Sequence, residues 1–231
     1  MTSVAGGVAM IVTNATFIIP SIKSVFLHKW TRAVVYFIMI FASSFYHSCK
    51  SFPGTCVFPP IIGRKMDFFF AQELIILTAL YLIIFPARYA FIERWLIWGS
   101  MVALFVVEVF TNEPFAVQLI IAGVSFIAIV GYWIAYARFE YLTTGRAKLP
   151  DYDWTALTMG IALTALACTL FATQKNWHNG YDWVHAVWHA SAALGQYFIL
   201  CCRDSGNRMA ALDKKVEKRY EAFAAMIRGS G

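Results

Sequence analysis

Residues 180–202 read GYDWVHAVWHASAALGQYFILCC, an apolar stretch long enough to cross a lipid bilayer as a helix. His185 and His189 stand four residues apart in this stretch, and a helix places positions i and i+4 on one face. Ionisable side chains inside a membrane span are costly, so they are rarely found there without a partner. Two imidazoles one turn apart can bind the same metal ion, and the alternative is that each forms hydrogen bonds to a neighbouring helix.

The composition of the whole chain is typical of a membrane protein. Of its 231 residues, 60% are hydrophobic and only 14% are charged. The apolar runs are continuous and do not alternate with polar residues, which favours helices over a β-barrel. We therefore predict an all-α integral membrane protein with a seven-transmembrane helix bundle, whose spans lie at about residues 4–22, 33–50, 67–86, 92–110, 114–138, 153–172 and 180–202.

The distribution of Lys and Arg predicts how this bundle is oriented. With seven spans, one side of the membrane receives only Lys50, Arg64, Lys65 and Lys175, and the other side receives the remaining 15 of the 19 basic residues. Because basic residues concentrate on the cytosolic side, we expect the N-terminus outside and the C-terminus in the cytosol. The net charge of +6 then lies mostly at the cytosolic face, where it suits anionic lipid, and the sequence contains no nucleic-acid-binding motif.

The predicted domain organisation is a transmembrane domain at 1–203 followed by a cytosolic tail at 204–231. From Met209 to Ile227, apolar side chains of the tail recur at spacings of three and four, while the opposite face is basic. This pattern predicts an amphipathic helix, which either lies on the inner leaflet or packs against the cytosolic loops.

A third histidine is expected at a depth similar to that of the first two. His47 ends the second predicted span, three residues before Lys50, roughly 5 Å below the outer boundary of the membrane. His185 and His189 then lie roughly 7 and 13 Å deep. Three neutral imidazoles and one open coordination position make a zinc site of the catalytic type. We therefore predict that His47, His185 and His189 bind one zinc ion.

Two oxygen-bearing side chains accompany these histidines. Ser43 lies one turn before His47, and Asp67 begins the third predicted span on the same side of the membrane. Asp67 could orient a zinc-bound water or accept an imidazole N–H, and Ser43 could donate to either. If the protein is a hydrolase, Ser43 and Asp67 are its candidate catalytic residues. The alternative for Asp67 is a helix N-cap or an ion pair with Arg64 or Lys65.

The five cysteines are too few for a disulfide scaffold. Cys49 and Cys56 flank a short loop on the outer, oxidising side, where we expect a disulfide between them. Cys201 and Cys202 end the last span at the cytosolic face, where they are either palmitoylation sites or ordinary thiols. Cys168 is interpreted as a small core residue.

Several of these motifs together resemble a known superfamily. The pairs Ser43/His47 and His185/His189, each with three residues between, and Asp67 resemble the metal motif of the CREST superfamily of seven-helix membrane proteins, which includes alkaline ceramidases and adiponectin-receptor-like proteins. Within it, FYHSC at 45–49, the short outer loop with a second cysteine, and YDWVHAVWHASA at 181–192 are most similar to the myomaker-like proteins.

This resemblance implies a plasma-membrane, multi-pass protein that promotes cell–cell fusion of the myoblast type, with zinc at the three histidines. It also implies membrane lipids as partners, with a homodimer and a partner on the apposed cell as further expectations. The site chemistry favours a different class of function, a zinc-dependent lipid amidase or hydrolase of the alkaline ceramidase type. Fold and metal alone do not decide between the two functions.

Overall fold

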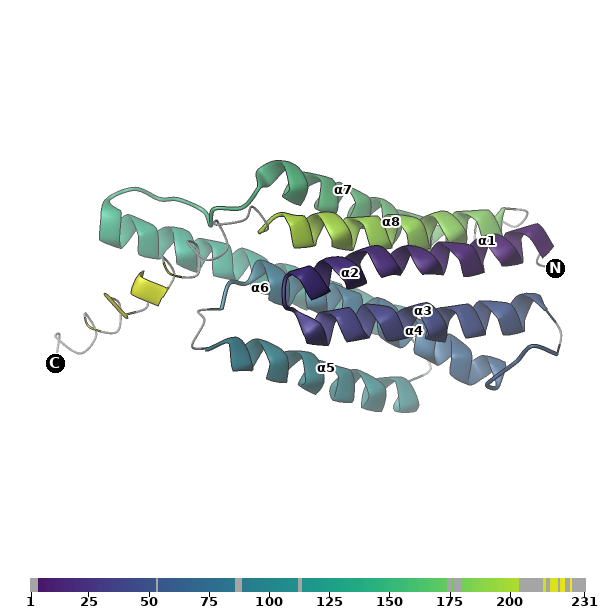
Figure 1. The fold of residues 1–231 in the computed structure, drawn as a ribbon. Helices are drawn as coiled ribbons and strands as arrows, with labels where there is room; N and C mark the ends of the chain where they lie inside the picture. The colour runs from purple at the N-terminus through teal and green to yellow at the C-terminus, as the bar shows by residue number, and fades with distance from the viewer. Residues whose placement is uncertain are drawn as a thin grey trace.

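The computed structural model of the chain is an elongated helical bundle (Figure 1). It describes residues 4–52, 54–85, 89–111, 114–173, 176, 180–203, 214, 217–219, 221–222 and 225. Within these residues the elements are α1 (Val4–Asn14), the 3-10 helix η1 (Ala15–Phe17), α2 (Ile18–Phe26), α3 (Trp30–Ser51), α4 (Pro60–Leu82), α5 (Ala90–Phe110), α6 (Pro114–Thr144), α7 (Trp154–Thr173) and α8 (Tyr181–Cys201).

The prediction of an all-α protein is confirmed for the described residues, and the first predicted span contains a local change of helix type. α1, η1 and α2 follow one another without a loop and form one stretch, Val4–Phe26. At the change, the Thr13 hydroxyl donates to the carbonyl of Ala9 and the Thr16 hydroxyl donates to the carbonyl of Thr13. Hydroxyl groups that bond back to the helix in this way often bend it.

Five helical stretches of the described chain are long and apolar enough to cross a membrane: Val4–Phe26, Trp30–Ser51, Ala90–Phe110, Ala116–Thr144 and Trp154–Thr173. They indicate a multi-pass membrane protein. α4 and α8 have similar lengths, 23 and 21 residues, but are not among these five stretches. These two helices carry Asp67 and the pair His185 and His189, so most of the predicted site lies on helices with a weaker membrane signal, while His47 and Ser43 lie on α3, which is one of the five stretches.

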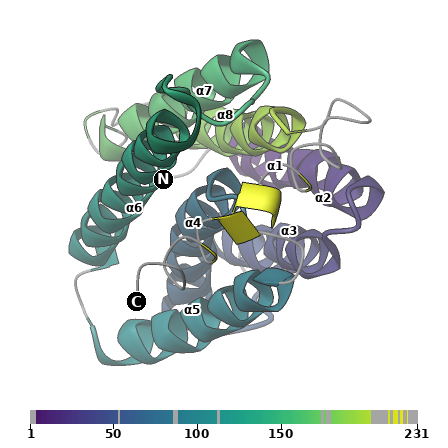
Figure 2. The ribbon, with the colours of Figure 1, turned by 90° about the vertical axis from the view of Figure 1, so that its left-hand side faces the viewer.

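The helix α4 occupies the middle of the bundle. Viewed along the bundle (Figure 2), the other helices surround it, and it packs against α3, α5, α6 and α8. α6 is the most exposed of the five candidate spans, with 6% of its apolar stretch buried, compared with 44% for α3. The bundle therefore has a polar inner helix and apolar outer helices, the reverse of the order found in a water-soluble protein.

The start of α4 differs from the prediction. α4 begins at Pro60, seven residues before the expected start of the third span at residue 67. Proline is favoured at the first helical position because the backbone N–H that it lacks would have no partner there. Asp67 therefore lies two turns inside α4 and is not an N-cap residue, so that alternative for Asp67 is wrong.

The three free cysteines differ in exposure. Cys168 is exposed on α7, so its interpretation as a core residue is wrong; Ala167 occupies the buried position beside it. At the end of α8, Cys201 is partly exposed and Cys202 is buried. Of the two predicted lipidation sites, Cys201 is therefore the more accessible thiol.

Most of the predicted tail helix lies outside the described residues, including its apolar positions Met209, Leu212, Val216, Tyr220, Phe223 and Ile227. The described tail residue Arg219 forms an ion pair with Glu140 of α6, and its guanidinium donates a 2.6 Å hydrogen bond to the Tyr136 hydroxyl. This part of the tail therefore contacts α6 near its C-terminal end.

α7 and α8 cross closely at two glycines. A Cβ atom on Gly160 would lie 3.0 Å from the backbone nitrogen of Ile199 and 3.2 Å from the carbonyl oxygen of Gly195. A Cβ atom on Gly195 would lie 3.2 Å from the backbone nitrogen of Thr164. Small residues allow membrane helices to approach to this distance, and the contact fixes α8 against α7 below the histidine pair.

We predict that Gly160→Ala destabilises the protein by about 1–3 kcal/mol, because the new methyl group must push two helix backbones apart. Gly123→Ala is the matched control, since a Cβ at that position of α6 meets nothing within 4 Å. Thermal unfolding in detergent micelles measures both variants. Equal melting temperatures for the two variants would contradict the close crossing.

Candidate metal centre

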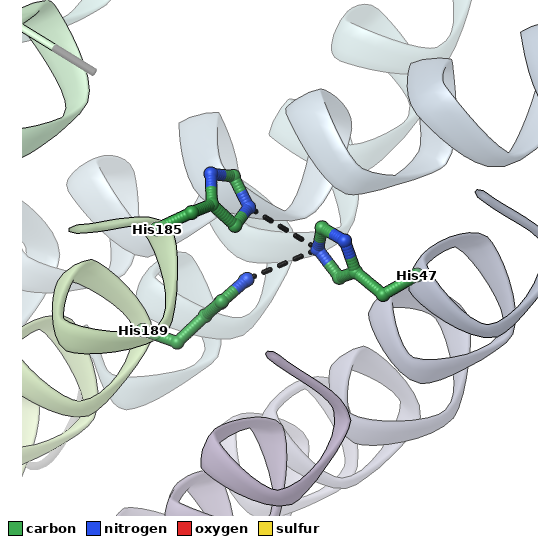
Figure 3. Close-up of side chains that lie close together, drawn as sticks. All are labelled: His47, His185 and His189. Atoms are coloured by element: carbon green, nitrogen blue, oxygen red, sulfur yellow. Dashed lines mark hydrogen bonds between the residues drawn. The ribbon is translucent and has the colours of Figure 1, made fainter. Parts of the chain in front are cut away.

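Three histidine side chains meet between α3 and α8 (Figure 3). His47 lies four residues before the end of α3, and His185 and His189 lie within the first three turns of α8. The Nε2 atom of His47 lies 3.2 Å from Nε2 of His185 and 3.1 Å from Nε2 of His189. All three side chains are buried. The structure thus brings together the three histidines that the sequence singled out.

Hydrogen bonding alone does not account for this convergence. A neutral ring nitrogen offers either one proton or one in-plane lone pair, so Nε2 of His47 cannot form two well-aligned hydrogen bonds at once. A tetrahedral zinc ion at about 2.0–2.1 Å from each nitrogen would instead hold its ligand nitrogens roughly 3.3 Å apart. The distances from His47 to the other two histidines are close to that value. The cluster could therefore bind a metal ion.

Asp67 and Ser43 are held beside this cluster. The Ser43 hydroxyl donates a 2.6 Å hydrogen bond to Oδ1 of Asp67, and Oδ2 of Asp67 lies 3.8 Å from Nε2 of His47. The second distance is too long for a hydrogen bond. It nevertheless places the carboxylate on the Nε2 side of the ring, the side on which the other histidines converge. If a metal ion binds to the cluster, this position allows Asp67 to contact another ligand of that ion, whereas it does not allow Asp67 to support the His47 ring through Nδ1.

The alternative partners proposed for Asp67 are engaged elsewhere. The Lys65 ammonium donates to the last carbonyls of α5, at 2.6 Å from the oxygen of Glu108 and 3.3 Å from that of Val109. The Arg64 guanidinium lies over the Phe68 ring, 5.7 Å from its centre. Lys65 therefore caps the C-terminal end of α5, where a cation is favourable. Among the described residues, neither cation forms an ion pair with Asp67.

Aromatic rings that the sequence analysis did not single out enclose the histidines. Tyr181 stacks on His185 with ring centres 5.4 Å apart, and Trp188 packs against His185 and His189 at 4.8 and 4.3 Å. Trp188 in turn packs against Phe171 of α7 at 5.2 Å. The sequence did contain a signal for them, since Tyr181 and Trp188 stand four residues before and three residues after His185. These rings fix the orientation of both imidazoles.

A disulfide lies next to His47. Cys49 and Cys56 are joined across the loop between α3 and α4, and their Cα atoms are 4.3 Å apart. Gly54, at the turn of this loop, has a φ of 88°, a conformation that glycine adopts without strain. The bond ties the end of the helix that carries His47 to the segment that leads into the helix of Asp67.

We predict that purified protein contains one zinc ion per chain and that His185→Ala combined with His189→Ala abolishes zinc binding. Two of three ligands are lost in this variant, and a single imidazole cannot hold the ion against chelation. Metal analysis of the purified protein measures the content. Replacement of His28, a histidine in the α2–α3 turn, is the matched control. Wild-type protein without zinc, or zinc retained by the double variant, would contradict the assignment.

Comparison with known proteins identifies the family to which the chain belongs. The family model described as "Protein of unknown function (DUF3522)" matches residues 2–190, a range that contains the three histidines, Ser43 and Asp67. None of the curated proteins matches the chain. The protein is thus a member of the DUF3522 family, a family of unknown function whose matched region here includes a buried three-histidine cluster.

Proposed function

We propose that this protein is a zinc-dependent hydrolase that cleaves an amide or ester bond of an acyl lipid. The observation that carries this proposal is the position of the Asp67 carboxylate: one oxygen accepts a hydrogen bond from Ser43, and the other faces Nε2 of His47, the atom that His185 and His189 also approach. A purely structural metal site is normally closed by four protein ligands. Three imidazoles with a nearby carboxylate that is not a ligand resemble a catalytic site instead.

The donor set fits zinc. Neutral imidazole nitrogens are common zinc ligands, and three of them leave one position of a tetrahedral ion available. Because these ligands are uncharged, they do not reduce the charge of the ion. When bound in such a site, zinc lowers the pKa of water to about 7 and so supplies a nucleophile at neutral pH.

The side chains of the protein would move the proton and exclude solvent. In the hydrolysis, water adds to the acyl carbon, the C–N or C–O bond breaks, and the leaving atom takes up the proton that the water loses. In this proposal Asp67 accepts this proton and returns it to the leaving atom. Ser43 holds the carboxylate in position, and the rings of Tyr181 and Trp188 limit the access of bulk water.

The location of the site supports a lipid as the substrate. The cluster is buried inside a bundle that contains several candidate membrane-spanning helices. A lipid can approach such a site from the surrounding membrane with its hydrocarbon chains still in an apolar environment. We further propose seven spans with the N-terminus outside, because four basic residues fall on the side of the site and 15 on the side of the tail. The site then faces the outer leaflet, and the plasma membrane is the proposed location.

We expect Asp67→Asn to lower kcat by roughly 100-fold or more while zinc content stays close to that of the wild type, because the variant removes the proton acceptor and keeps all three ligands. Fatty-acid release from acyl lipids in detergent micelles measures the rate. Asp151→Asn, a change at an exposed loop residue, is the matched control. Zinc-loaded wild-type protein that releases no fatty acid from any ceramide or glycerolipid would end the hydrolase proposal.

A second proposal is a cell–cell fusion factor of the myoblast type. It rests on the sequence resemblance to the myomaker-like proteins at 45–49 and 181–192. In this proposal the metal joins α3 to α8 and stabilises the fold, and the function lies in remodelling two apposed membranes. A homodimer and a partner on the apposed cell belong to this proposal.

If the fusion proposal holds, the protein on the surface of fusion-competent cells promotes mixing of their contents, and His47→Ala loses this activity together with surface expression, because the metal no longer joins the two helices. A two-colour content-mixing assay, with the surface level of each variant quantified, measures both effects. Asp67→Asn separates the two proposals, since it should abolish hydrolysis and leave fusion intact. Absence of mixing by well-expressed wild-type protein would refute the fusion role.

A further inference from the structure

A buried asparagine in the first helical stretch has no hydrogen-bond partner among the described residues. The side chain of Asn14, the last residue of α1, is fully buried, and neither its amide nitrogen nor its carbonyl oxygen forms a hydrogen bond there. The neighbouring Thr13 and Thr16 hydroxyls donate to backbone carbonyls of the same stretch. A buried amide group without a partner costs free energy, so such a group in a native structure requires an explanation, for example a bound water.

The buried face of α1 directs Asn14 toward the metal centre. α1 and α4 each pack against both α3 and α8, and viewed along the bundle α1 lies on the side opposite to α4 (Figure 2). Asp67 of α4 therefore reaches the centre from one side, and the buried face of α1 covers the other side. Among the buried residues of α1, which are Gly6, Gly7, Met10 and Asn14, only Asn14 has an amide or other hydrogen-bonding side chain.

The packing of α1 against α3 fixes the depth of Asn14. A Cβ atom on Gly7 would lie 2.5 Å from the Cβ atom of Ser51, so these two residues face each other where the helices meet. The two helices run in opposite directions (Figure 1). Seven residues beyond this contact, Asn14 therefore lies level with Ser44 of α3. Ser44 precedes His47 by three residues, which corresponds to roughly 4.5 Å of axial rise.

On α8 the same level falls beside His189. His47 approaches both histidines of α8, so it faces the turn between them. α8 also runs opposite to α3 (Figure 1), and three residues inward from the middle of that turn is the position after His189. Asn14 therefore lies within about one residue of His189, or roughly 1.5 Å in depth. The next turn agrees with this register, since Phe17 of η1 and Ala193 of α8 belong to the same apolar cluster.

The second ring nitrogen of His189 also lacks a partner among the described residues. Nε2 of His189 approaches His47, whereas Nδ1 is buried without a hydrogen bond. A neutral imidazole that binds a metal through Nε2 carries its proton on Nδ1, and metal-binding histidines almost always donate this proton to an acceptor. With zinc bound, His189 therefore needs an acceptor at Nδ1, and the carbonyl oxygen of Asn14 is an acceptor at the same depth.

We propose that Asn14 is a positioning residue of the metal centre and holds His189 through one buried water. The water accepts a hydrogen bond from the Nδ1–H of His189 and donates one to the carbonyl oxygen of Asn14. A buried water typically forms about three hydrogen bonds to polar groups that otherwise lack partners, and the two side chains provide three such atoms. This inference rests on a zinc ion at the cluster, which both proposed functions assume, and does not depend on hydrolysis.

The zinc affinity of the full-length protein, measured by competition with a chelator in detergent micelles, tests this proposal. We expect Asn14→Leu to weaken zinc binding by roughly 10–100-fold, because His189 loses the partner that orients its ring. Asn14→Asp keeps an oxygen acceptor of the same size and should bind zinc at least as tightly as the wild type. Unchanged affinity in the Leu variant, or an equal loss in the Asp and Leu variants, would overturn the proposal.

Ser24→Ala is the matched control. The Ser24 hydroxyl is also fully buried without a hydrogen bond to the described residues, but it lies in α2, ten residues further along the chain. Removal of this hydroxyl should leave zinc affinity unchanged. A loss equal to that of Asn14→Leu would show that any change in the first helical stretch loosens the site, and that result would overturn the specific role of Asn14.

A double-mutant cycle separates the positioning of His189 from a general effect on the fold. In the His189→Ala background, Asn14→Leu should cause no further loss of zinc affinity, whereas in the His185→Ala background it should still weaken binding. Without zinc, Asn14→Leu should melt no lower than the wild type, because leucine replaces an amide that has no direct partner. An equal loss of affinity in both backgrounds would overturn the assignment to His189.

Failure of this proposal is distinguishable from failure of the proposed function. If the wild type and Asn14→Leu bind zinc equally well, the role of Asn14 is refuted and the metal centre stands. If the wild type binds no zinc, the metal centre and the role of Asn14 are refuted together. Fatty-acid release enters neither measurement, so a protein that cleaves no lipid but shows the expected zinc affinities would refute the hydrolase and support the role of Asn14.

Discussion

A polar side chain within the hydrocarbon of a membrane must find its partner inside the protein, and this constraint orders the helices of the bundle. α4 carries Asp67, Gln72 and Glu73 and lies in the middle. Gln72 donates a 2.8 Å hydrogen bond to Glu108 of α5, and Ser100 of α5 donates to Glu73 at 3.1 Å. α5 therefore joins the bundle through hydrogen bonds as well as apolar contacts, while its outer face remains free for lipid.

The same constraint applies at the N-terminal end of α3, where a second polar cluster lies at the end opposite to His47. There Arg32 is fully buried and forms a 2.8 Å ion pair with Glu93, which also pairs with Lys29 at 2.8 Å. Burial lowers the pKa of Lys29, and the Glu93 carboxylate opposes this shift. A buried ion pair adds little net stability, but a single partner left alone is costly. Clusters at both ends of α3 thus fix its depth and register, and with them the position of His47.

Much of the site could be predicted from sequence because its determinants are local. The spacing of His185 and His189 assigns them to one helix face, and counting residues from the ends of two apolar segments places His47 at a similar depth. The position of Asp67 within α4 was harder to predict, since the continuous apolar run begins only after Arg64 and Lys65, whereas the helix already begins at Pro60. The contacts of Lys50 with Tyr181 and of Gly160 with Ile199 join segments far apart in the chain, and no local pattern specifies such pairs. The orientation in the membrane remains a prediction from charge.

The length of α6 has a mechanical consequence. At 1.5 Å per residue its 31 residues span roughly 46 Å, whereas the hydrocarbon of a typical bilayer is about 30 Å thick. α6 must therefore tilt or protrude, and the turns beyond the predicted end of this span at residue 138 include Glu140, which receives Arg219. A helix that is longer than the bilayer is thick changes its tilt when the bilayer thickness changes. Such a change in the tilt of α6 would displace Glu140 relative to the rest of the bundle. The ion pair thereby couples the C-terminal tail to the thickness of the surrounding membrane.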